Sequence, residues 1–167
     1  MALEDLLLLG DPRLHQKSIE IGKNEIETIE PMIAKLHETL MAFREKYGAG
    51  RAIAAPQVGV FKRLVYMHTD RPHILINPVL TDQSPEMMEL WDDCLSFPEL
   101  LVKVKRHRRC KIRFLDPDLR EHVWDLGDDL SELLQHEVDH LDGILATQRA
   151  IDPHSFRYRP EPFMRLK

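Results

Sequence analysis

One short stretch constrains this chain more than any other, the five residues His136-Glu137-Val138-Asp139-His140. Two histidines four positions apart lie one turn apart on the same face of a helix, so both imidazoles can bind a single metal ion. Glu137 lies between them, where it can move a proton of a water molecule held at that ion. The same pattern also arises by chance in polar helices. A metal site therefore needs a third ligand from elsewhere in the chain.

The composition excludes several classes of protein. Of the 167 residues, 43% are hydrophobic and 31% are charged, which is ordinary for a globular protein. This length favours a single domain, residues 1–167, that buries about 70% of the surface exposed by its unfolded chain. The net charge of −5 gives no general attraction to nucleic acid or to anionic membranes. The apolar run at residues 6–9 is too short for a signal or a membrane span, so we expect a cytoplasmic protein with neither a membrane nor a specific nucleic-acid partner.

The spacing of apolar residues predicts one early helix, several short strands and one late helix. Residues 25–46 have apolar side chains at steps of three or four, which is typical of an amphipathic helix. A second helix is expected to carry the two histidines, with Asp128 or Asp129 as its cap and Gly143 at its end. The tail, residues 149–167, is expected to be irregular or a short packed arm. Short strands separated by turns are expected at residues 64–67, 74–76, 101–105, 110–115 and 123–126.

Basic residues occupy the outward positions of the strands expected at 101–105 and 110–115. A solvated strand face is the simpler interpretation of this pattern. The alternative is a patch that meets RNA or an acidic partner, including the ribosome. These residues are Lys103, Lys105, Lys111 and Arg113 on the strands, with Arg106, Arg108 and Arg109 at the turn between them.

Cysteine is the other residue type that can complete a metal site. Two cysteines do not make a disulfide framework, so each is free to be a core residue or a ligand. Cys110 is in line with Ile112 and Phe114 and is expected to be a small buried hydrophobe. Cys94 lies off any alternating strand, next to acidic residues. On its own it is most simply a core thiol. The other seven histidines lie on scattered polar stretches without ligand spacing.

Three blocks, in this order along the chain, resemble the motifs of the peptide deformylase family. Gly50-Arg51-Ala52-Ile53-Ala54-Ala55-Pro56-Gln57 is similar to the block Gly-x-Gly-[Leu/Ile]-Ala-Ala-x-Gln. Asp92-Asp93-Cys94-Leu95-Ser96 is similar to Glu-Gly-Cys-Leu-Ser. Gln135-His136-Glu137-Val138-Asp139-His140 matches Gln-His-Glu-x-Asp-His. The likeness extends from about residue 6 to residue 146, and it implies an α+β fold with small mixed or antiparallel sheets around a central metal-binding helix.

The resemblance implies a metal centre and a reaction. Cys94, His136 and His140 would be the ligands, and the fourth position of the ion would be open for water. The implied ion is Fe2+ in the cell, with Zn2+, Ni2+ or Co2+ as substitutes in a purified sample. The implied reaction is hydrolysis of N-formyl-methionyl peptides of nascent proteins to formate and a free amino terminus.

The resemblance also implies catalytic and substrate-binding residues. Glu137 would act as general base and then deliver the proton to the departing amine. The side-chain amide of Gln57 and the backbone N–H of Leu95 would stabilise the oxyanion. Leu133 is expected to line the pocket for the methionine side chain. The substrate is expected to lie like an added strand along residues Gly50, Arg51, Ala52 and Ile53.

Four positions depart from the family's pattern, and they leave alternatives open. Ala52 replaces a glycine, Asp92 and Asp93 replace Glu-Gly, and Glu132 stands where an apolar pocket residue is expected. An inward Glu132 would disturb the methionine pocket, whereas an outward one would change nothing. The alternatives are a deformylase-like protein with changed N-acyl specificity or little turnover, and another metal hydrolase with the same two histidines. The tail after Ala146 does not resemble the family's long terminal helix, so the resemblance supports no ribosome contact through that helix.

Overall fold

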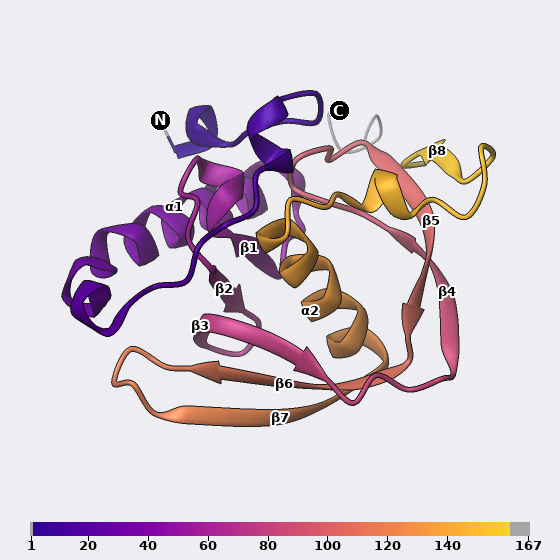
Figure 1. The fold of residues 1–167 in the computed structure, drawn as a ribbon. Coiled ribbons are helices and arrows are strands. Elements are labelled where there is room, and N and C mark those ends of the chain that lie inside the picture. Colours follow the sequence, from indigo (N-terminus) through magenta and orange to yellow (C-terminus); the bar gives the residue numbers. More distant parts are fainter. Residues whose placement is uncertain (1, 161–167) are drawn as a thin grey trace.

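The helix α2 (Asp128–Leu141) is the central element of the computed structural model, which describes residues 2–160. Two antiparallel sheets surround it, with strand orders β1-β2-β3-β6-β7 and β4-β5-β8, and α2 contacts strands of both (Figure 1). This arrangement confirms the predicted α+β class. The strands are β1 (Ala52–Ala54), β2 (Leu64–His68), β3 (Pro72–Thr81), β4 (Met87–Asp92), β5 (Leu100–His107), β6 (Arg109–Leu115), β7 (Glu121–Gly127) and β8 (Phe156–Tyr158).

The part of the five-stranded sheet formed by β1 and β2 is buried on both faces. Alternate residues of a strand point to opposite faces. In β2, Leu64 and Tyr66 therefore pack with the helix α1 (Glu30–Tyr47), whereas Val65 and Met67 pack in the cluster that contains the apolar residues of α2. The sheet thus separates the two helices, and α2 also contacts β5 of the second sheet.

The early helix starts later than its apolar pattern predicts. Residues 23–28 form a short 3-10 helix, and α1 begins at Glu30 rather than at residue 25. The reason is Pro31, which lacks an N–H and is tolerated in a first turn but breaks a helix interior. Gly48 ends α1 in a left-handed conformation, with φ of 70°.

Strands β5 and β6 belong to different sheets, although they are consecutive and only Arg108 separates them. β5 pairs with β4 and β8, whereas β6 pairs with β3 and β7. β5 therefore does not share a sheet with β6 and β7, which follow it in the chain. Alternation along each strand indicates which side chains face inward, but it does not specify the neighbouring strand.

The ends of α2 differ from each other in how well the sequence predicts them. Gly127 precedes the helix, and no side chain caps it, so the predicted Asp cap is wrong. Asp128 instead has a φ of 48° and pairs with Arg108. Gly143 follows the helix as predicted, with φ of 73°, and a Cβ there would lie 2.4 Å from the carbonyl oxygen of His15.

The C-terminal segment adds a strand to the second sheet. A 3-10 helix, Ala146–Arg149, follows α2, and β8 then pairs with β5. The predicted short packed arm therefore contains regular structure, while residues 161–167 of that prediction lie outside the described residues. No helix in residues 2–160 is long and apolar enough to cross a membrane.

Candidate metal centre and adjoining cavity

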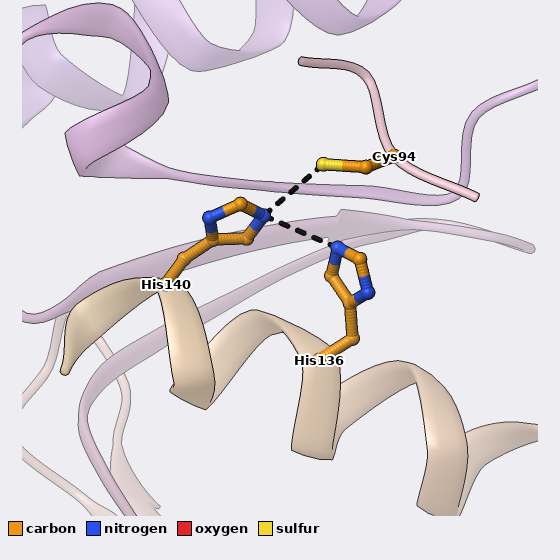
Figure 2. A group of neighbouring side chains, drawn as sticks. All are labelled: Cys94, His136 and His140. Atoms are coloured by element: carbon orange, nitrogen blue, oxygen red, sulfur yellow. Dashed lines mark hydrogen bonds between the residues drawn. The ribbon is translucent and has the colours of Figure 1, made fainter. Parts of the chain in front are cut away.

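Cys94, His136 and His140 come together at the inner face of α2. The Nε2 atoms of the two histidines lie 3.1 Å apart, and the Sγ of Cys94 lies 3.2 Å from Nε2 of His140. All three ligand atoms lie within 4.8 Å of one another, and the three side chains point toward a common centre (Figure 2). All three residues are buried.

Two elements place these ligands. The histidines follow from the helical repeat of α2, because residues four apart share one face. Cys94 follows β4, in a tight turn where the N–H of Phe97 donates to the carbonyl of Cys94 at 3.1 Å. The thiol accepts weak hydrogen bonds from the N–H of Ser96 and from Nε2 of Gln57, both at 3.5 Å. These contacts hold the sulfur toward the histidines.

A buried carboxylate orients one of the histidines. Nδ1 of His136 lies 2.9 Å from Oδ2 of Asp92, which leaves Nε2 facing the centre. Burial raises the pKa of Asp92, but His136 and Arg106 outweigh burial and lower it to about 2. Burial lowers the pKa of His136, but the negative charges of Asp92 and Cys94 outweigh burial and raise it well above its usual value. Burial and the neighbouring His136 lower the pKa of His140.

Arg106 is buried at the same place, contrary to its predicted position at a surface turn. Its side chain is 2% exposed and donates to Asp92 at 2.9 Å and to Asp139 at 2.5 Å. Arg149 adds a second guanidinium on Asp139, at 2.5 and 2.7 Å. The sequence did contain a sign of this position, because Arg106 continues the inward alternation of Val102 and Val104 on β5.

Glu137 is buried, and its carboxylate forms no ion pair with a residue in the range 2–160. Its Oε2 makes no hydrogen bond with any described residue, and burial raises the pKa of Glu137 to about 7. An unpaired buried carboxylate is costly for a fold, so its presence suggests a functional group. It lines a cavity of about 500 Å3 that opens beside Cys94 and His136.

These residues fit a bound metal ion. A thiolate and two imidazoles are the donor set of a catalytic site with an open position. The Asp92–His136 contact is the usual outer hydrogen bond of a ligand histidine. The Nε2 atoms of the two imidazoles are close enough to bind one cation together when both rings are neutral.

Two hydrogen-bond donors lie close to Cys94. The Oε1 of Gln57 accepts from the N–H of Ala54 at 2.9 Å, which turns the amide nitrogen toward Cys94 and toward Ser96 at 3.1 Å. The backbone N–H of Leu95 makes no hydrogen bond within residues 2–160. Both positions were expected from the sequence to stabilise an oxyanion, and both lie next to the cysteine.

The predicted substrate residues are only partly brought together. Gly50, Arg51, Ala52 and Leu133 line the cavity. The side chain of Ile53 does not, because it is completely buried in the core beside α1. Only the backbone of Ile53 can therefore face a substrate. β1 lies at the edge of its sheet, so one side of this strand is available to an added strand.

The structure accounts for two of the departures without strain. Ala52 lies in the regular strand β1, without positive φ, and its methyl group packs in the core cluster against α2. A glycine is therefore unnecessary at this position. Asp92 keeps contact with both His136 and Arg106 despite its shorter side chain.

The other two departures place charged residues on the cavity wall. Asp93 pairs with Arg159 from the C-terminal segment. Glu132 points inward and pairs with Arg51 at 2.5 Å. Neither pair had a local signal in the sequence, because the partners lie 66 and 81 positions apart.

Comparisons with known proteins show the family of this chain. The family described as polypeptide deformylase matches residues 3–155. The chain is 35% identical over 173 residues to peptide deformylase 1 of Prochlorococcus marinus, covering 96% of this chain and 88% of that protein. It is 34% identical over 171 residues to the peptide deformylase of Thermomicrobium roseum, covering 96% and 93%.

The fold is also similar to that of solved peptide deformylase structures. The crystal structure of peptide deformylase from Thermotoga maritima has a TM-score of 0.79 and 30% identity, over 88% of this chain and 97% of that one. A peptide deformylase from Synechococcus elongatus, in complex with actinonin, has a TM-score of 0.80 and 27% identity, over 89% and 79%.

Proposed function

This chain belongs to the polypeptide deformylase family, and on that premise we propose that Cys94, His136 and His140 bind its catalytic metal, which is Fe2+ in the cell. Zn2+, Ni2+ and Co2+ are the proposed substitutes in purified protein. The chain is a metal-dependent hydrolase that removes the formyl group from N-formyl-methionyl peptides. The observation that carries the proposal is the convergence of three ligand atoms beside a buried, unpaired Glu137 at one end of a cavity.

When bound, the ion supplies a Lewis acid that polarises the formyl oxygen and lowers the pKa of water. Glu137 takes a proton from the attacking water, whose oxygen forms a bond to the formyl carbon. Glu137 then delivers a proton to the amine nitrogen as the C–N bond breaks, so that formate and a free amino terminus leave. A pKa of about 7 for Glu137 in the metal-free protein suits a group that both accepts and releases a proton near neutral pH.

The site must also stabilise the oxyanion that forms on the attacked formyl group. The amide nitrogen of Gln57 is turned toward Cys94 by the bond from Ala54, and it can donate to an oxygen beside the thiol. The N–H of Leu95 has no other described partner and is available for the same oxygen. Donors that are fixed before the reaction stabilise developing charge without reorganisation. We assign both groups this role.

We also propose where the substrate peptide binds and where in the cell the protein acts. The peptide lies along the free edge of β1, beside Gly50, Arg51, Ala52 and the backbone of Ile53, with Leu133 under its first side chain. Residues 1–167 form one catalytic domain that acts in the cytoplasm. Three of the basic residues pair with acidic neighbours in the chain: Lys103 and Lys105 with Glu89, and Lys111 with Asp82 and Asp125.

The test is formate release from a formyl-Met tripeptide by protein loaded anaerobically with Fe2+. We expect turnover that disappears in Glu137→Ala while the metal content stays stoichiometric. Cys94→Ala should instead lose the metal. Turnover of acetylated or unformylated peptides at a similar rate would point to a different metal hydrolase. Tight substrate binding without formate release would point to a protein of little turnover.

A further inference from the structure

An ion pair forms one wall of the cavity beside the metal centre. Nη2 of Arg51 lies 2.5 Å from Oε1 of Glu132, and both residues line the cavity. Arg51 immediately precedes β1, and Glu132 is on α2, so the pair joins the two elements that enclose this part of the cavity. The side chain of Glu132 is 13% exposed and that of Arg51 is 43% exposed. The pair is therefore partly, but not completely, hydrated.

Given the proposed function, the position of the ion pair determines which part of a substrate it contacts, namely the side chain of the first residue. Glu132 lies one turn before His136 on α2, which is a rise of about 6 Å. With the formyl carbon beside Glu137, the side chain of the first residue enters the region between Arg51, Glu132 and Leu133. This region has an apolar floor at Leu133 and a charged side. A side chain that fills it covers the ion pair and removes water from it.

A methionine thioether and a more polar side chain differ in how well they accept a hydrogen bond from the charged side of this region. The guanidinium has five N–H donors, and within residues 2–160 Arg51 uses one of them, for Glu132. A thioether is a weak acceptor and does not replace the water it displaces. The sulfoxide of methionine has the same chain length and carries one strong acceptor oxygen. A hydrogen bond from a charged donor is among the stronger ones in proteins.

We propose that the Arg51–Glu132 pair is a specificity determinant that lets this deformylase accept formyl peptides whose first side chain ends in a hydrogen-bond acceptor, with methionine sulfoxide as the matched case beside methionine. Glu132 holds the guanidinium against the cavity, and Arg51 donates to the acceptor. Both residues act on the substrate side chain and not on the formyl group.

The experiment compares kcat/KM for formyl-Met(O)-Ala-Ser, formyl-Met-Ala-Ser and formyl-norleucyl-Ala-Ser. We expect the sulfoxide-to-methionine ratio of the unaltered enzyme to fall by about tenfold or more in the double variant Arg51→Leu/Glu132→Leu, which removes the pair without leaving a single charge. The norleucine-to-methionine ratio should stay constant or rise. The matched control is Lys62→Leu/Glu25→Leu. These two residues form an ion pair of 2.7 Å and do not line the cavity, so their loss should leave all ratios unchanged.

The outcomes separate this inference from the proposed function. Formate release from the methionine peptide with an unchanged sulfoxide ratio in the double variant would overturn the inference alone. No formate from any of the three peptides would overturn the proposed function instead. If the double variant does not fold, Arg51→Lys supplies the test, because an ammonium keeps the charge but reaches less far. An Arg51→Lys ratio equal to that of the unaltered enzyme would also overturn the inference.

Discussion

The side chain of Arg159 pairs with Asp93, the residue directly before Cys94. The backbone N–H of Arg159 also donates to the carbonyl of Glu99 at 2.8 Å, and its Nε donates to the carbonyl of Pro98 at 3.3 Å. The segment that follows β8 is therefore attached to the turn that presents the cysteine. Arg159 lies beyond the residues that match the family, and the carboxylate it binds stands where the family motif has glycine.

Arg159→Ala should weaken substrate binding more than it affects the chemical step. The variant leaves Asp93 unpaired at the cavity rim, where the turn loses a support. We expect KM for a formyl-Met tripeptide to rise by about two- to fivefold with little change in kcat, because a half-exposed ion pair contributes at most about 1 kcal/mol. In the double variant Asp93→Gly/Arg159→Ala the rise should be smaller. Identical KM values for Arg159→Ala and the unaltered enzyme would exclude this role.

Arg106→Leu should destabilise the fold and loosen the metal. It leaves Asp92 and Asp139 without one of their charged donors in the interior, which typically costs about 3 to 5 kcal/mol of unfolding free energy. Because Asp92 orients His136, the metal affinity should fall by about 10- to 100-fold. Urea unfolding and a metal titration measure the two effects. Arg108→Leu is the matched control, because its pairs with Glu86 and Asp128 are exposed to solvent, and it should change both measurements far less.

Gly50→Ala should damage the cavity wall. Gly50 has a φ of 130°, and an added Cβ would lie 3.3 Å from the side chains of Leu40 and Phe43. Its carbonyl also accepts from Nε of Arg44 at 2.6 Å, so the backbone cannot shift freely. We expect a loss of about 1 to 3 kcal/mol in unfolding free energy and a higher KM. Gly10→Ala separates strain from crowding, because Gly10 has φ of 106° but nothing within 4 Å of its Cβ position.

Glu137 should make the metal-free protein less stable at high pH. The carboxyl has its ordinary pKa of 4.5 in the unfolded chain and a pKa of about 7 in the fold. A raised folded pKa means that the stability is complete below pH 4.5 and is lost as the pH rises through 7. Glu137→Gln should remove this loss, so that its unfolding free energy relative to the unaltered protein increases by about 3 kcal/mol between pH 4 and pH 8. An equal difference at both pH values would contradict the prediction.

The sequence predicts those features of the site that depend on local spacing. The two histidines of α2 and the glycine after it follow from the helical repeat and from backbone conformation, and the structure places them as expected. Arg106 could have been predicted to face inward from its alternation with Val104, but its acidic partners come from β4 and α2. The Asp93–Arg159 contact and the separation of β5 from β6 depend on residues distant in sequence, for which local patterns contain no information.

The enclosure of α2 by both sheets has a consequence for the synthesis of the chain. The helix occupies residues 128–141, so the ribosome makes β1 to β7 before α2 is complete. Until then the apolar faces of both sheets lack the element that covers them, and partly made chains with exposed strands tend to aggregate. The last third of α2 carries His140 and the buried Leu141, so we expect a nascent chain to become compact only after this point has left the exit tunnel.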